Sequence, residues 1–327
     1  MPTRLRSVSV LLGLLLTAPT LAATPPSPYA ELAQQEARVA AIGFRLTTAN
    51  AAWCPATQPQ FGWIWGDPRL YDAKNRPEAL AAYGASPSDD AFIAAVAPGS
   101  PAAAAGLHPG SPVTSVNGID VAPPIGSDPF ERIGTLETLF AALPTDAPAR
   151  VADGSASASI MPVRGCVSDF RVEARDRLEG AADGRLVLVN AGLVGFAADD
   201  AELAAPIAHE LAHNILRHRA RLDAAGVDRG LGKQFGRNAR LFRQTEVEAD
   251  RLSVWLLAGA GYDPHAAVRF WTNFGEKTGN PLFQAGTHPR WRARVASIET
   301  EIAAIEAARA AGRPLEPPLI AAPPPLE

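Results

Sequence analysis

The stretch His209-Glu210-Leu211-Ala212-His213 carries more structural information than any other part of the sequence. The pattern H-E-x-x-H on a helix binds zinc through two histidines and places a carboxylate beside the metal. At about 100° per residue, positions four apart lie roughly 40° from each other, so both imidazoles can reach one ion. The motif predicts a zinc site with Glu210 as general base. The alternative is a surface helix with two unliganded histidines.

The motif supplies two ligands, so a third has to come from elsewhere in the chain. The metzincin extension is missing, because Leu216 and Arg219 stand where its glycine and third histidine would be. His218 follows His213 by five positions and would point about 140° away on one continuous helix. The pattern therefore predicts a distal carboxylate as third ligand.

A second helical pattern, from about 238 to 259, offers that carboxylate. Glu246 and Asp250 share one face of it, and Asp250 could accept the second N–H of a ligating histidine. Glu248 lies about 160° from Glu246, which predicts a side chain facing solvent or a surface partner. Without the upstream motif, a solvated acidic face would explain these residues equally well.

The segments H-E-L-A-H and E-V-E-A-D-R together resemble the zinc metallopeptidases of the HtpX and CAAX prenyl endopeptidase type, the gluzincins of metallopeptidase family 48. The resemblance implies one zinc ion per chain, bound by His209, His213 and Glu246. It makes Glu210 the general base and Asp250 a support for a ligating histidine. The fold it implies is α+β, with a mainly helical zincin-like domain, a small β-sheet and an inserted β-rich domain.

A strand-like stretch, Arg185–Asn190, is followed by Ala191-Gly192-Leu193, similar to the family's step before the active-site helix. We expect this strand to bind the backbone of extended polypeptide substrates by β-augmentation. The residues predicted to do so are Leu186, Val187, Leu188 and Val189.

Further downstream, Thr287-His288-Pro289 and Arg294 resemble the family's T-H-P-x-x-x-x-x-R segment. The resemblance implies that His288 and Arg294 lie near the metal as catalytic residues, where an N–H donor can stabilise an oxyanion. Alternatively, His288 ligates zinc in a resting state. Without the resemblance, an ordinary helix start and a surface salt bridge would explain both residues.

Pro206 lies inside the segment that should carry the motif. In one interpretation the helix starts at Asp199, with Glu202 three positions later as in a capping box, and Pro206 kinks its interior. In the other the helix starts at Pro206. Both keep the motif on one continuous helix.

Residues 91–121 resemble a bacterial PDZ domain, with P-G-S-P-A, a short helix ending in A-G-L, and a hairpin at N-G; Ser111 replaces the usual aspartate. The resemblance implies a helix over 129–142 and a closing strand over 157–163. Its groove would bind an extended segment or a chain terminus. The alternative is an alanine-rich loop insertion.

The first 23 residues are typical of a secretory signal peptide, with basic residues, an apolar run from 8 to 16 and small residues after it. The run is too short to span a bilayer, and no later stretch reaches about 18 uncharged apolar residues, so we expect no transmembrane anchor. We therefore predict an exported protein, periplasmic or secreted. In that setting Cys54 and Cys166 should form a disulfide rather than stay as free buried thiols.

The composition allows two ordinary cores, with 47% hydrophobic and 20% charged residues, and a net charge of −4 gives no nucleic-acid footprint. The predicted order is a signal peptide (1–23), a helix packing on the peptidase (28–55), the PDZ-like domain (61–165), the zinc metallopeptidase domain (167–312) and a proline-rich disordered tail (313–327).

These features predict an exported zinc metalloendopeptidase that degrades unfolded or misfolded envelope proteins, with the PDZ module binding substrate or partner segments. The alternative is a non-catalytic PDZ adaptor or holdase on a zinc-stabilised scaffold. Glu210 argues against it, because a structural zinc site does not need that carboxylate. An exopeptidase would need a second charged cluster to hold a substrate terminus, and the sequence offers none.

Overall fold

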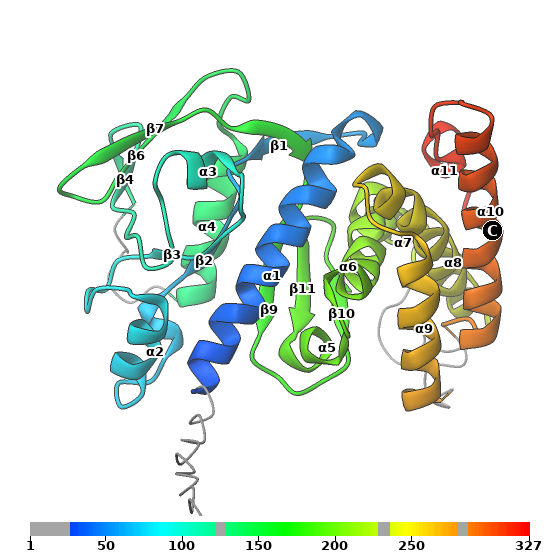
Figure 1. Cartoon of the computed structure of the whole chain (residues 1–327), viewed down its shortest axis with the longest axis horizontal. Coiled ribbons are helices and arrows are strands. Elements are labelled where there is room, and N and C mark those ends of the chain that lie inside the picture. The colour runs from blue at the N-terminus through cyan, green and yellow to red at the C-terminus, as the bar shows by residue number, and fades with distance from the viewer. Residues whose placement is uncertain (1–26, 122–127, 228–235, 280–286) are drawn as a thin grey trace, which may run out of the picture.

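The computed structural model describes residues 27–121, 128–227, 236–279 and 287–327, so the predicted signal peptide lies outside the described residues (Figure 1). The helices are α1 (Pro28–Ala49), α2 (Arg76–Tyr83), α3 (Pro101–Ala104), α4 (Pro129–Ala141), α5 (Ala191–Phe196), α6 (Asp200–Ile215), α7 (His218–Ala224), α8 (Gly236–Gly259), α9 (His265–Thr278), α10 (Trp291–Ala310) and α11 (Pro318–Ala321), with 3-10 turns at Ala51–Trp53 and Pro68–Leu70. The strands are β1 (Thr57–Gln60), β2 (Trp63–Gly66), β3 (Phe92–Val96), β4 (Ser115–Val116), β5 (Ile119–Asp120), β6 (Ala149–Ala152), β7 (Ser157–Ile160), β8 (Val163–Cys166), β9 (Asp169–Glu173), β10 (Gly180–Ala182) and β11 (Leu186–Asn190). This mixed, mostly helical architecture is compatible with the predicted α+β class.

Helix α1 runs through the middle of the molecule, between a β-rich part and a helical part (Figure 1). Ser27 caps it by accepting a hydrogen bond from the Ala30 N–H, and Pro28 occupies the first turn, where its missing N–H costs nothing. The helix contacts β3 and β8 on the β-rich side and β9 and α6 on the helical side. Apolar side chains therefore line it on both sides, and Val39, Ile42 and Leu46 are fully buried.

A three-stranded sheet in the order β10-β11-β9 lies beside α6. β11 pairs parallel with β9 and antiparallel with β10, so it is the central strand. Alternate burial places Val187 and Val189 in the main core. The sheet thus presents β10 toward the helix that carries the H-E-x-x-H motif.

The helical part packs α6 against α8 and α9, and α10 against α8 and α9. The apolar positions of α6 and α8 recur at helical spacing and fill the space between them. Its fully buried side chains include Leu203, Ile207, Leu211, Leu252, Leu256 and Phe270. This packing fixes α6 relative to α8, and with it the two motifs that the sequence singles out.

The β-rich part has a second core, made by strands β2, β3, β4, β6 and β7 and helix α4. Its small sheets have the orders β2-β3 and β5-β4-β6-β7, and β1 pairs with β8. The β4–β5 hairpin turns at Asn117 (φ 51°) and Gly118 (φ 81°), as a tight two-residue turn requires. The expected helix and closing strand correspond to α4 and β7, whereas the PDZ assignment itself stays a prediction.

Cys54 and Cys166 form a disulfide in the structure, with their Cα atoms 5.4 Å apart. Cys166 ends β8, where the chain passes from the β-rich part to the sheet beside α6. The bond therefore ties the segment after α1 to the junction of the two parts.

The segment 313–327 differs from the disordered tail that its prolines predict. It forms the short helix α11, and Leu319 is only 5% exposed. The Pro324 and Pro325 carbonyls accept hydrogen bonds from Arg221 and Gln244, at 2.7 Å each. Proline lacks an N–H but keeps its carbonyl, so a proline-rich segment can still dock on side-chain donors.

None of the described helices combines the length and the apolar character that crossing a bilayer requires.

Candidate active site

The motif helix α6 begins at Asp200, and the Asp199 side chain caps it by accepting a hydrogen bond from the Glu202 N–H at 2.8 Å. Pro206 therefore lies in the helix interior, as in the first of the two interpretations. His209 and His213 follow on the same continuous helix. The helix start at Pro206 is wrong, because the aspartate cap lies a full turn and more before it.

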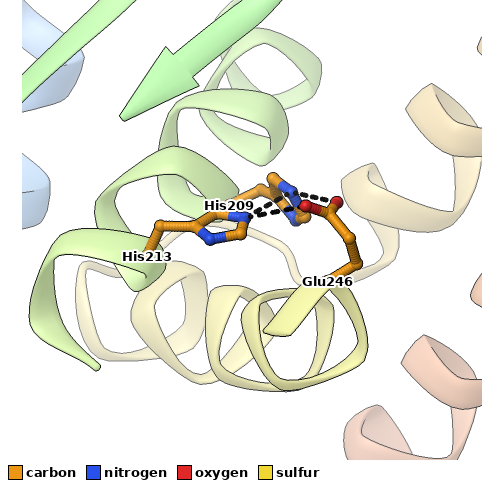
Figure 2. A group of neighbouring side chains, drawn as sticks. All are labelled: His209, His213 and Glu246. Carbon is orange, nitrogen blue, oxygen red and sulfur yellow. Dashed lines mark hydrogen bonds and ion pairs between the residues drawn. The ribbon is translucent and has the colours of Figure 1, made fainter. Parts of the chain in front are cut away.

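Figure 2 shows His209 and His213 on α6 and Glu246 on α8 pointing toward one another. The two Nε2 atoms lie 3.2 Å apart, and Glu246 Oε2 and Oε1 lie 3.3 Å from His209 Nε2 and 3.5 Å from His213 Nε2. A ligand atom from each residue falls within 4.8 Å of the others, with His209 and Glu246 well covered by neighbouring helices. The three residues that the sequence names as metal ligands thus meet at one point.

The three side chains fit a zinc ion. Zinc–ligand bonds of about 2.0–2.1 Å in a tetrahedral site imply ligand atoms about 3.3–3.4 Å apart. The two Nε2 atoms are 3.2 Å apart, and each lies at a similar distance, 3.3 or 3.5 Å, from a different oxygen of the Glu246 carboxylate. Two imidazoles and one carboxylate are also the donor types that a catalytic zinc site uses, with one position left open.

His209 is supported by a carboxylate on the neighbouring helix. Its Nδ1 lies 2.9 Å from Asp250 Oδ1, and Asp250 is 1% exposed. Arg294 on α10 donates from Nε to Asp250 Oδ2 at 2.8 Å, and its Nη2 lies 3.4 Å from Glu246 Oε2. The guanidinium also lies 4.0 Å from the ring centre of Trp271. Arg294 therefore holds two carboxylates of the site in place.

The electrostatics of this cluster favour a cation. Burial would lower the pKa of His209, but the carboxylates of Asp250 and Glu246 outweigh it and raise that pKa to about 10. Burial would likewise raise the pKa of Glu246, yet His288, His213 and His209 hold it well below its ordinary value. The Glu246 carboxylate is thus ionised and stabilises positive charge at the point where the ligand atoms meet.

Glu210 lies in the wall of a cleft of about 1120 Å³ that also contains the three candidate ligands. Burial raises the pKa of Glu210 to about 7; the charges of His209 and Arg294 lower it and that of Glu246 raises it. A carboxylate with this pKa can both accept and release a proton near neutrality, as a general base that later acts as acid must do. Its position supports the role that the sequence suggests.

Strand β10 borders the cleft beside Glu210. A Cβ atom added at Gly180 would lie 3.1 Å from Glu210 Oε1, so a glycine lets this strand approach the base closely. β10 pairs only with β11 among the described strands, which leaves its other edge toward the cleft.

The prediction that substrate pairs with Leu186, Val187, Leu188 and Val189 is wrong in its choice of strand. Those residues form β11, whose two edges already pair with β9 and β10. Periodicity identifies a buried strand but not its neighbours in the sheet, so the sequence could not distinguish the centre from the edge.

His288 and Arg294 both lie at the cleft, but in different situations. The His288 side chain is 40% exposed, and its Nε2 lies 3.4 Å from Glu246 Oε2. Arg294 is 9% exposed at its side chain and engaged with Asp250 and Glu246. The geometry therefore keeps both predictions for His288, an oxyanion donor or a zinc ligand in a resting state, and makes Arg294 a support for Glu246 and Asp250.

Sequence reasoning missed two residues of the site, His218 and Glu248. His218 is 2% exposed, and its Nδ1 lies 2.9 Å from His213 Nδ1. Its Nε2 lies 3.1 Å from Glu248 Oε2. The prediction of a solvent-facing Glu248 is wrong, because α7 folds back over that face of α8 and leaves Glu248 3% exposed.

The donor set of this cluster, two imidazoles and a carboxylate with a further glutamate beside them, is the kind that zinc metallopeptidases use. The model of Peptidase family M48 matches residues 178–232 and 231–302. The chain is similar to mitochondrial metalloendopeptidase OMA1 of Schizosaccharomyces pombe, at 30% identity over 36% of this chain and 41% of that protein. It is also similar to mitochondrial metalloendopeptidase OMA1 of Arabidopsis thaliana, at 32% identity over 33% of this chain and 26% of that protein.

These matches support a metalloendopeptidase of family M48, and they span less than half the length of either relative. The family match begins at residue 178, so it does not test the PDZ assignment. Both relatives are named OMA1, and the HtpX or CAAX prenyl endopeptidase type that the motifs suggested stays a prediction.

The prediction of an exported protein, periplasmic or secreted, is contradicted, because both relatives are named as mitochondrial proteins. The prediction rested on a short leader with basic and apolar residues. Several kinds of targeting segment share positive charge near the amino terminus, so these features do not identify one compartment.

Proposed function

We propose that the chain is a zinc-dependent metalloendopeptidase that hydrolyses peptide bonds in unfolded or misfolded polypeptides. The observation that carries this proposal is the meeting of His209, His213 and Glu246, with ligand atoms within 4.8 Å of one another and Glu210 beside them in an open cleft. A structural zinc site would be closed and would not need the additional carboxylate.

His209, His213 and Glu246 would hold the zinc ion, which when bound supplies Lewis acidity to the scissile carbonyl and the attacking water. Glu210 takes the proton of the water and delivers it to the leaving amine, and its pKa of about 7 suits both steps. His288, the more exposed donor at the cleft, stabilises the oxyanion in this scheme. Asp250 fixes the orientation of His209, and Arg294 fixes Asp250.

The substrate class follows from the edge of β10. An extended polypeptide pairing with that edge would pass directly beside Glu210, since Gly180 brings the strand close to the base. Backbone pairing gives affinity with little side-chain preference, which suits unfolded chains. Folded proteins do not offer an extended segment of this kind, so their cleavage should be slow.

In this proposal the PDZ-like part, residues 61–165, binds a segment of a substrate or partner and brings it to the peptidase. Its support is the sequence pattern and its separate core, which includes Ile93, Val116 and Ile160. The competing function is a PDZ adaptor or holdase in which zinc only stabilises the scaffold.

The test is a time course of casein cleavage by the zinc-loaded full chain and by Glu210→Gln. Glu299→Gln, the same substitution at an exposed position of α10, is the matched control. We expect cleavage by the wild type and the control and none by Glu210→Gln, with equal zinc content in all three. Equal cleavage by Glu210→Gln would refute the base, and zinc-loaded protein that binds casein without cleaving it would favour the adaptor.

A further inference from the structure

A chain of polar contacts begins behind the candidate ligand His213. The His213 and His218 rings lie 4.8 Å apart with an interplanar angle of 79°, and their Nδ1 atoms lie 2.9 Å from each other. His218 Nε2 then lies 3.1 Å from Glu248 Oε2. His218 and Glu248 are both buried, so their polar atoms need partners within the protein.

We propose that His218 and Glu248 are positioning residues for the peptidase reaction, which hold His213 in the orientation and tautomer that bind the metal. This inference rests on the proposed function, since it assigns His213 as a ligand. A metal-ligating histidine generally donates its second N–H to a fixed acceptor, which sets the ring orientation.

The tautomers follow from the contacts. His213 Nε2 faces His209 and Glu246, so it is the nitrogen directed at the metal. Nδ1 of His213 then carries the proton and donates it to His218 Nδ1, which must be the acceptor. His218 therefore holds its own proton on Nε2 and donates to the Glu248 carboxylate. Every contact in the chain has one donor and one acceptor.

The backbone conformation of a single residue, Arg217, makes this arrangement possible. Arg217 adopts φ 55° and ψ 38° between α6 and α7, a left-handed conformation that stops α6 and reverses the direction of the next side chain. On a continuous helix His218 would point away from His213, as its spacing of five positions implies. The break instead returns the imidazole to the side on which His213 lies.

Glu248 is itself held from two sides. Arg221 Nη1 donates to Oε2 at 2.6 Å, and Gln244 Nε2 donates to Oε1 at 2.9 Å. The same two residues donate to the Pro324 and Pro325 carbonyls. The segment 313–327 thus covers the outer end of the chain of contacts, and its docking would help to keep Glu248 in place.

The test compares four variants of the full chain. His218→Phe removes both nitrogens, whereas His218→Asn keeps an acceptor near the Nδ1 position but cannot reach Glu248. Glu248→Gln keeps the acceptor and loses the charge. The matched control is His265→Asn, because His265 makes a comparable contact with Glu306, at 3.0 Å, on an exposed surface far along the chain.

The readouts are zinc affinity by chelator competition, the visible spectrum of the cobalt-substituted protein, and the Tm of the zinc-free protein. We expect His218→Phe to weaken zinc binding by about 10- to 100-fold and to change the cobalt spectrum. His218→Asn should recover most of the affinity, Glu248→Gln should fall between them, and His265→Asn should match the wild type. A purely structural network would lower the zinc-free Tm of both His218 variants alike.

The proposal is overturned if His218→Phe binds zinc as the wild type does, or if both His218 variants lose affinity equally and in step with Tm. Failure of the proposed function is distinguishable, because it would appear as missing casein cleavage by a wild type that binds zinc normally. A wild type that does not bind zinc would overturn both.

Discussion

His209 and His213 lie on one helix and face one point, yet their supports differ. His209 rests on a carboxylate, Asp250, which Arg294 holds in turn. His213 contacts a second histidine, His218, and His218 in turn contacts the Glu248 carboxylate. The first support lies at regular helical spacing on α8, and the second depends on a break in the helix at Arg217. A supporting residue at regular helical spacing, such as Asp250, can be predicted from the sequence. One that is placed by a break in the helix, such as His218, cannot.

Glu246 is shared by both histidines, so its loss should have the largest effect. We expect Glu246→Gln to weaken zinc binding by more than about 100-fold, because even residues behind the ligands contribute about 10- to 100-fold. Chelator competition measures this. Unchanged zinc affinity would show that Glu246 is not a ligand. The two histidines would then not share a metal ion with Glu246.

Asp250→Asn tests the support of His209. We expect zinc affinity to fall by about 10- to 100-fold. The zinc-free protein should lose less than the full cost of an unpaired buried charge, about 3–5 kcal/mol, because Arg294 would keep only its longer contact with Glu246. Chemical denaturation measures the stability. Asp263→Asn is the control, since its pair with Arg269 is half-exposed and worth about 0–1 kcal/mol. A loss at Asp250 no greater than at Asp263 would contradict this support.

The pH dependence of the reaction should reflect protonation of the Glu210 carboxylate rather than of the residues that support His209 and His213. Below its pKa the carboxyl carries a proton and cannot accept another, so kcat/KM should fall as pH decreases. The pKa of Glu210 is raised to about 7 by burial, and a bound cation would lower it, so the acidic limb should lie at or below about pH 7. A pH profile with a peptide substrate measures this, and an acidic limb well above pH 7 would contradict the assignment.

Substitutions at Arg217 should have the smallest effects, and two of them should differ from each other in stability and zinc affinity. Glycine adopts the left-handed conformation without strain but raises the conformational entropy of the unfolded chain. Arg217→Gly should therefore change the free energy of unfolding by less than about 1 kcal/mol and leave zinc affinity intact. Arg217→Val should lower both, because a β-branched residue disfavours this conformation. Similar behaviour of the two variants would show that the break at Arg217 does not place His218.

Much of the site was predictable because it lies on two regular helices. The motif on α6 and the carboxylates of α8 follow helical spacing, and the structure brings His209, His213, Glu246 and Asp250 together. The structure joins Cys54 and Cys166, as predicted, although that prediction combined their even number with an exported setting that the relatives contradict.

The remainder depends on long-range packing that spacing does not encode. Glu248 is buried only because α7 packs over that face of α8. The strand edge at the cleft belongs to β10 because β11 is paired on both sides, with β10 and β9. The docking of 313–327 depends on donors from α7 and α8 that are about a hundred positions away in the sequence. Tertiary contacts of this kind override local composition.

The most direct measurement is the zinc K-edge X-ray absorption spectrum of the zinc-loaded full chain, together with its zinc content. We expect one zinc per chain, with two imidazoles and a carboxylate oxygen among ligands at about 2.0–2.1 Å. A protein that retains no zinc, or a spectrum with fewer than two imidazoles, would contradict a metal centre built from His209, His213 and Glu246.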